Sequence, residues 1–91
     1  MHKEATTTAL ISPTINLNGS DRAYLVAERR AAMDHLQDAI EALARVTPHG
    51  RDYPADYDRC LDDRQTHFAR IQAIKSLREA IYTEAVAIQQ Q

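Results

Sequence analysis

The side chains best suited to binding gather in the segment 48–54, where two prolines and a glycine interrupt any helix. Four of them lie close together: His49, Arg51, Asp52 and Tyr53. A helix that begins just after this segment offers free backbone N–H groups and the positive end of its dipole, which both attract phosphate or carboxylate. An arginine adds a two-pronged donor, and a tyrosine adds a flat face for stacking. The sequence therefore predicts an anion-binding site at this loop.

The following helix extends the predicted site by three residues, Tyr57, Arg64 and His67. Arg64 and His67 lie at or beside the apolar stripe of that helix. A charged side chain there must pair, reach out to solvent or face a polar cavity. In one interpretation Arg51, Arg64 and His67 line a pocket for a negatively charged small molecule. In the other, they reach to solvent from the edge of the stripe or pair across a subunit interface.

The loop also has a second interpretation, that of an ordinary turn. Asp52 or Asp56 would then cap the following helix, Tyr53 would pack on the helices, and Arg51 would pair with an acid. Within the predicted site, we assign most of the binding to Arg51, His49 and Tyr53.

A second set of candidate ligands follows the same helix at steps of four, three and four residues: Asp56, Cys60, Asp63 and His67. The preceding helix is expected to bring a further group to a similar level: Asp34, His35 and Asp38. Carboxylate and imidazole suit zinc or manganese. However, the Glu-x-x-His and His-Glu-x-x-His patterns are absent, and charges aligned on a long helix are usually a solvated face. We therefore predict no metal ion and no cofactor.

The single cysteine, Cys60, does not form a catalytic pair with His67. Seven residues of helix separate their Cα atoms by about 10 Å, which is too far for a hydrogen bond within one chain. Cys60 is instead expected to be a small buried apolar residue. Because the sequence also lacks a phosphate-binding glycine loop and a nucleophile elbow, we predict that the protein is not an enzyme.

Composition narrows the class of protein. The chain has 91 residues, which is enough for one domain, and a net charge of -2, which argues against binding to a nucleic-acid polymer or an anionic membrane. A lone cysteine suits a reducing compartment. No apolar run approaches the length of a membrane span, and the first residues lack the apolar core of a signal peptide. A cytoplasmic location is expected.

Apolar periodicity predicts an all-α fold with two helices. An extended arm is expected over residues 1–19, because Ile15 and Leu17 alternate with polar residues. The first helix is expected at about 20–46, with Ser20 as its N-cap. Its apolar stripe comprises Leu25, Ala32, Leu36, Ala39, Ile40, Leu43 and Val46. After a loop at 47–55, the second helix is expected at about 56–90, with an apolar face of Leu61, Phe68, Ile71, Ile74, Leu77, Ile81, Ala85 and Ile88.

An antiparallel hairpin of these helices would place Leu43 near residues 56–61 and Leu25 near residues 74–77. The end of the second helix, residues 81–88, would then extend beyond the first. Its apolar side chains would need either the arm or another subunit as a cover. We therefore predict a homo-oligomer, a dimeric four-helix bundle or larger.

Two segments resemble those of small helical proteins of phage and prophage genomes. They are Ile15-Asn16-Leu17-Asn18-Gly19 and Pro48-His49-Gly50-Arg51-Asp52-Tyr53-Pro54, and the resemblance spans roughly residues 15–75. The group has no established activity, so the resemblance assigns no role to any residue. It implies a protein that binds a target in the host cell. Our leading hypothesis is a non-enzymatic inhibitor of a host defence pathway that holds an anionic, nucleotide-like ligand or a host protein. The alternative is an assembly protein whose helices serve only subunit packing.

Overall fold

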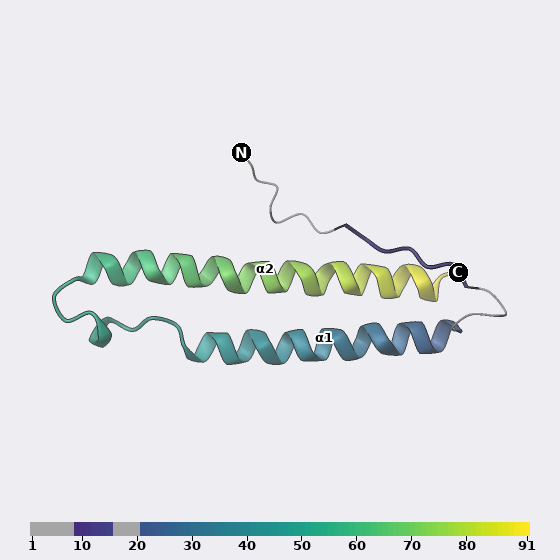
Figure 1. Cartoon of the computed structure of the whole chain (residues 1–91), viewed down its shortest axis with the longest axis horizontal. Coiled ribbons are helices and arrows are strands. Elements are labelled where there is room, and N and C mark those ends of the chain that lie inside the picture. Colours follow the sequence, from purple (N-terminus) through teal and green to yellow (C-terminus); the bar gives the residue numbers. More distant parts are fainter. Residues whose placement is uncertain (1–8, 16–20) are drawn as a thin grey trace.

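The chain folds into a long hairpin of two antiparallel helices (Figure 1). The structure, a computed structural model, describes residues 9–15 and 21–91. Helix α1 spans Arg22–Arg45, the short 3-10 helix η2 spans Gly50–Asp52, and α2 spans Tyr57–Gln89. These described residues contain no strand. The prediction of an all-α hairpin is therefore confirmed.

Short polar side chains fix where both long helices begin. Asp21 caps α1, because its carboxylate accepts a hydrogen bond of 2.8 Å from the backbone N–H of Tyr24. The predicted cap, Ser20, lies outside the described residues, and the cap is one residue later than predicted. Asp56 caps α2 in the same way and accepts from the N–H of Arg59 at 3.1 Å. One of the two caps proposed for the second helix is thus confirmed.

Contacts between α1 and α2 show how the two helices are aligned. Near the loop, an imidazole nitrogen of His67 lies 2.7 Å from the backbone oxygen of Leu43. Near the termini, Arg29 and Glu84 form an ion pair of 3.4 Å. The C-terminal turns of α2 therefore lie beside the N-terminal turns of α1, and the two helices end close together there (Figure 1).

This alignment corrects the predicted one. Leu43 does not lie near residues 56–61, and Leu25 does not lie near residues 74–77; the partners on α2 are about ten residues further along. Residues 81–88 consequently have α1 beside them, and the unmatched turns of α2 are the first ones, next to the loop. The prediction assumed a tight reversal, whereas the connection between the helices runs back along the first turns of α2.

Few apolar side chains are buried. Among the described residues, the hydrophobic core consists of Ile40, Cys60 and Ile88. Four members of the predicted apolar faces are exposed within the single chain: Val46, Leu61, Phe68 and Leu77. The reason is that one partner helix can cover only one side of α2, while apolar side chains are distributed around its whole circumference.

The arm, residues 9–15, runs in an extended conformation beside the C-terminal half of α2 (Figure 1). The Ile11 N–H donates to a carboxylate oxygen of Glu84 at 3.1 Å, and the Ile15 N–H donates to the side-chain oxygen of Gln91 at 3.0 Å. The Gln91 amide donates in turn to the carbonyl of Pro13 at 2.8 Å. The described part of the arm thus lies along α2. Leu17, the other apolar residue of the predicted segment, lies outside the described residues.

The two long helices are rich in charged side chains along their whole length. Neither α1 nor α2 combines the length and the apolar character that crossing a bilayer requires.

Candidate functional site

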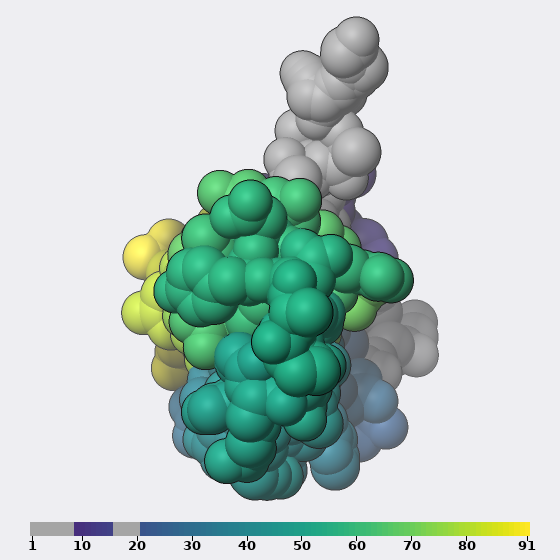
Figure 2. Space-filling model, turned by 90° about the vertical axis from the view of Figure 1, so that its left-hand side faces the viewer, coloured from purple at the N-terminus to yellow at the C-terminus, as the bar shows by residue number. Residues whose placement is uncertain are grey.

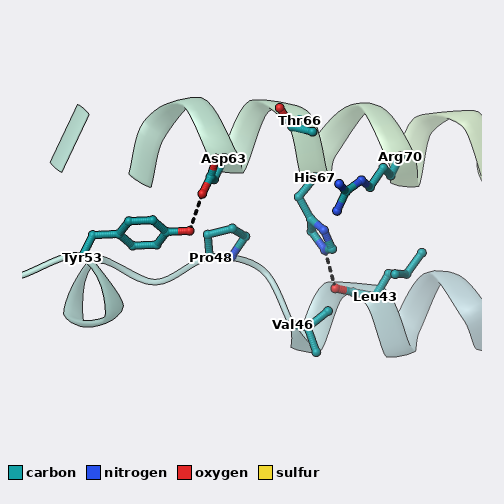
Figure 3. A pocket seen from close by; sticks show the side chains of 8 residues that line it. All are labelled: Leu43, Val46, Pro48, Tyr53, Asp63, Thr66, His67 and Arg70. Carbon is teal, nitrogen blue, oxygen red and sulfur yellow. Dashed lines mark hydrogen bonds between the residues drawn. The ribbon is translucent and has the colours of Figure 1, made fainter. Parts of the chain in front are cut away.

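A cavity of about 390 Å³ lies between the loop, the end of α1 and the first half of α2 (Figure 3). Its lining residues are Leu43, Val46, Pro48, Tyr53, Asp63, Thr66, His67 and Arg70. We call it the loop-end cavity. One wall is apolar and comes from α1 and the start of the loop, whereas α2 contributes the polar side chains. Ligand pockets commonly combine an apolar wall with a few converging polar groups.

His67 is the buried member of the polar wall, with 5% of its surface exposed. Its Nε2 atom lies 2.7 Å from the carbonyl oxygen of Leu43. A carbonyl oxygen can only accept, so Nε2 carries the proton and donates it. In the neutral imidazole Nδ1 is then an acceptor. His67 therefore joins α2 to α1 with one nitrogen and keeps the other available for hydrogen bonding.

Tyr53 and Asp63 form the end of the cavity nearest the loop (Figure 3). The phenol O–H of Tyr53 donates to a carboxylate oxygen of Asp63 at 2.6 Å. This hydrogen bond, together with partial burial and the negative charge of Asp63, raises the pKa of the Tyr53 phenol above its ordinary value of 10.0. Tyr53 is therefore a neutral donor at physiological pH, and one carboxylate oxygen of Asp63 is occupied.

The loop is held in place by further hydrogen bonds. The Arg64 side chain donates from Nε to the carbonyl of Pro48 at 2.8 Å. Within the loop, His49 caps η2, since its Nδ1 accepts from the N–H of Arg51 at 3.1 Å. Both side chains are therefore used to shape the connection rather than to line the cavity.

The structure separates the predicted site residues into two groups. Tyr53 and His67 line the loop-end cavity. The other five do not: His49, Arg51, Asp52, Tyr57 and Arg64 are all exposed residues outside its lining. A pocket formed jointly by Arg51, Arg64 and His67, which the sequence suggested, is thus not what the structure shows, because η2 carries Arg51 to the outer side of the loop.

Sequence reasoning missed Thr66 and Arg70 as lining residues. Together with Asp63 and His67 they are spaced by three, one and three residues, so the four side chains share one face of α2. This spacing is visible in the sequence. The expected apolar face of the helix runs through the same segment, so the spacing did not indicate a separate polar face.

The candidate metal ligands weighed in the sequence do not come together. Within residues 9–15 and 21–91, no three histidine, cysteine or acidic side chains lie close enough to hold a metal ion. Asp56 is engaged as a helix cap and Asp63 by a tyrosine. Asp34, expected at the same level, lies instead in a groove with Arg78, because the helices are aligned differently from the prediction.

Cys60 is a buried apolar residue, as predicted, with none of its surface exposed. It lies beneath the loop in the part of α2 that α1 does not cover. Its thiol is therefore shielded from any molecule in the cavity.

No protein-family model, no curated protein and no solved structure matches this chain. The assignment of the site therefore depends on the arrangement of its own residues. The cavity gathers a guanidinium, an imidazole, a hydroxyl and an apolar wall. That combination can bind an anionic group at one place and an apolar or aromatic group at another.

Proposed function

We propose that the protein is a non-enzymatic binding protein that holds a small anionic ligand in the loop-end cavity. The observation that carries the proposal is the convergence of Thr66, His67 and Arg70 on one side of an apolar-walled cavity. The one ion pair among the described residues joins Arg29 to Glu84. The Arg70 guanidinium consequently has no carboxylate partner within the described residues and is available for a phosphate or carboxylate group.

The dimensions of the cavity also limit the length and the volume of the ligand. Asp63 and Arg70 are seven residues apart on α2, which corresponds to about 10 Å along the helix. A ligand that spans this distance would place its anionic group at Arg70 and a hydrogen-bond donor near Asp63. The cavity volume of about 390 Å³ lies near the lower limit of ligand pockets, which extend from roughly 300 to 1,000 Å³. We therefore propose a small ligand with one anionic group and one ring system at some distance from it, such as the phosphate and the base of a nucleoside monophosphate.

Binding without catalysis fits the surrounding chemistry. The Cys60 thiol is buried, so it is not placed as a nucleophile toward the cavity, and His67 uses Nε2 to join the two helices. The resemblance to small phage proteins supports a role in which the ligand is sequestered from a host pathway. The host cytoplasm is the proposed location, since a free cysteine suits a reducing compartment.

Ligand binding is tested with two arginine variants. Native mass spectrometry of protein purified from cells shows a retained ligand as added mass, and isothermal titration with a nucleoside monophosphate and with inorganic phosphate measures affinity. Arg70→Gln is expected to weaken binding at least tenfold, because it removes a charge-assisted contact of about 1.5–3 kcal/mol. Arg51→Gln is the matched control, since Arg51 lies outside the cavity lining. Equal loss in both variants would place the site on the outer side of the loop instead.

A second candidate function is assembly through the helices, and the exposed aromatic residues of α2 favour it. In that case wild-type protein would bind no ligand, and neither arginine variant would differ from it. Association, rather than binding, would then be the property to measure.

A further inference from the structure

Besides Leu77, which lines the groove beside the arm, four large apolar or aromatic side chains of α2 are exposed. They are Tyr57, Leu61, Phe68 and Tyr82, and we call them the α2 stripe. Leu61, Phe68 and Tyr82 are separated by seven and fourteen residues, which are multiples of the heptad spacing found where two helices pack along their lengths. At about 100° per residue, all four side chains fall within roughly 60° of the helix circumference. They therefore lie along one side of the helix, with Arg64 and Lys75 between them.

The α2 stripe lies on a different flank of α2 from the loop-end cavity and the arm. On the same helical projection, the α2 residues that line the cavity point about 140° away from the stripe. Leu77, Ile81 and Glu84, which line the groove beside the arm, share the cavity's flank. In the view along the hairpin, the purple arm likewise lies on one side of the helix pair (Figure 2). Covering the stripe would leave the cavity and the arm accessible.

The two helices differ in how their apolar side chains are distributed around the helix axis. The apolar side chains of α1 are concentrated on the side that faces α2. Those of α2 are spread around the helix, so α1 and the arm leave the stripe without a cover among the described residues. A helix with this distribution cannot bury all of its apolar side chains against one partner helix. At the C-terminal end the stripe is continuous with a groove in which Tyr82 lies beside Val26 and Met33.

We infer that a second copy of this chain covers the α2 stripe, with the two α2 helices packed side by side and antiparallel. At roughly 200 Å² for a whole aromatic side chain, the exposed 63% of Tyr57, 62% of Phe68 and 52% of Tyr82 amount to about 350 Å² per copy. Two copies thus supply about 700 Å², more than half of the roughly 1,200 Å² at which stable interfaces begin. Leu61 and the flanking long side chains supply the remainder. The same surface on both copies gives a closed, two-fold dimer.

Charge selects the antiparallel orientation. Arg64, Lys75 and Glu79 are exposed residues that fall within the same arc of α2 as the stripe. In a parallel pair in register each would face its own copy, and like charges in contact are strongly unfavourable. In an antiparallel pair with Leu61 opposite Tyr82 of the other copy, Arg64 falls opposite Glu79. The same register places Phe68 opposite Lys75, which permits a cation–π contact.

This inference does not depend on a ligand in the cavity. Sedimentation equilibrium of the full chain at micromolar concentration should give twice the monomer mass of 10.3 kDa. Phe68→Glu is expected to raise the dimer Kd at least a hundredfold, since it places an unpaired charge in the contact of both copies. The control is Tyr24→Glu, because Tyr24 is comparably exposed, at 56%, and belongs to α1 rather than to the stripe. Circular dichroism checks that each variant keeps its helices.

A charge exchange tests the register independently of Phe68. Glu79→Lys should weaken the dimer, and adding Arg64→Glu should restore it. A spin label on Gln65→Cys should lie about 20 Å along the helix from its copy in the antiparallel dimer, but next to it in a parallel one. A wild-type monomer at all concentrations would overturn the inference and point to a different protein as the partner of the stripe. Equal association in Phe68→Glu and wild type, or no restoration by the charge exchange, would overturn it as well.

Discussion

Two stretches of non-helical chain lie against α2, one at each end, and the means by which they are held differ. At the loop end, α2 side chains reach back over a short sequence distance: Asp63 to Tyr53, Arg64 to Pro48 and His67 to Leu43, with separations of 10 to 24 residues. At the arm end, the corresponding contacts join residues 73 to 78 positions apart. The contacts at the loop end therefore join residues that are close in sequence. The contacts at the arm end join residues that only the folded hairpin brings together.

The same difference extends to charge and burial. The arm end contains a shielded ion pair, in which Arg29 is 17% and Glu84 8% exposed, and Ile88 is almost fully buried there. At the loop end, the buried Cys60 is a smaller side chain, and a cavity lies beside it. Stability is thus expected to depend more on the arm end, and ligand binding on the loop end. Substitutions at the two ends should therefore differ in how much they destabilise the fold.

Ile88→Ala should be the most destabilising substitution. Ile88 is 1% exposed within one chain, and truncation of such a residue removes apolar contacts and leaves a cavity, at a cost of about 3 kcal/mol. Urea unfolding followed by circular dichroism at fixed protein concentration measures this loss. Val46→Ala, at a position that is 65% exposed, is the control and should change stability by less than about 0.5 kcal/mol. Comparable losses at the two positions would refute the division of roles between the two ends.

Glu84→Ala should rank second, at about 2–3 kcal/mol, because it leaves the partly buried Arg29 without its partner. The buried Nε of Arg29 already has no hydrogen-bond partner in the part of the chain that the structure describes. The amide of Ile11 should also exchange with solvent faster, since it loses its acceptor.

Replacing both members of the ion pair, Arg29→Met with Glu84→Leu, should recover most of the stability but not the slow exchange at Ile11. Glu41→Ala serves as an exposed control. If the double variant is no more stable than Glu84→Ala, the ion pair is not the cause.

The loop end was also the part of the fold more accessible to sequence reasoning. The prolines and glycine of segment 48–54 predicted a break between two helices, and the acidic residue at position 56 provided one of the expected caps. Two of the predicted site residues, Tyr53 and His67, line the cavity. His49, Arg51 and Asp52 are exposed on the loop, because a 3-10 turn decides which side chains point outward and residue types alone do not indicate that turn. Tyr57 and Arg64 are exposed on α2.

The arm end was predicted less well for a physical reason. The alignment of two helices depends on the path of their connection, and a loop that runs back along α2 shifts every contact by several turns. Ile81, expected to meet either the arm or another subunit, lies in a groove that the arm residue Ile11 also lines. Because apolar side chains surround α2, several alignments would bury similar area. Polar contacts such as that between Glu84 and Ile11 distinguish among them, and they join residues too far apart in sequence for any periodic pattern to reveal.

His67→Leu should have an intermediate effect, at about 1 kcal/mol. Its hydrogen bond to the Leu43 carbonyl is lost, but that carbonyl also accepts from the backbone N–H of Val46 at 3.1 Å and so keeps a partner. His35→Leu, at an exposed position of α1, is the matched control and should be nearly neutral. Urea midpoints compare the two. A loss above about 3 kcal/mol for His67→Leu would mean that the loop end carries as much stability as the arm end.

Tyr53→Phe should have the smallest effect, below that of His67→Leu, because water can replace a hydrogen bond near the surface.

The pH dependence of the effect of Tyr53→Phe on stability identifies its cause. The hydrogen bond to Asp63 raises the pKa of the Tyr53 phenol above 10.0, so the folded state retains the proton more strongly than the unfolded state does. A group with a raised folded pKa stabilises the fold fully below its unfolded pKa, and this contribution disappears as the pH rises through the folded value. The stability difference between wild type and Tyr53→Phe should therefore be constant from about pH 7 to 9 and decline above about pH 10. Tyr57→Phe, at a position 63% exposed, should show no difference at either end of this range. A Tyr53→Phe difference that grows with pH would mean that the phenol does not donate to Asp63 in the folded protein.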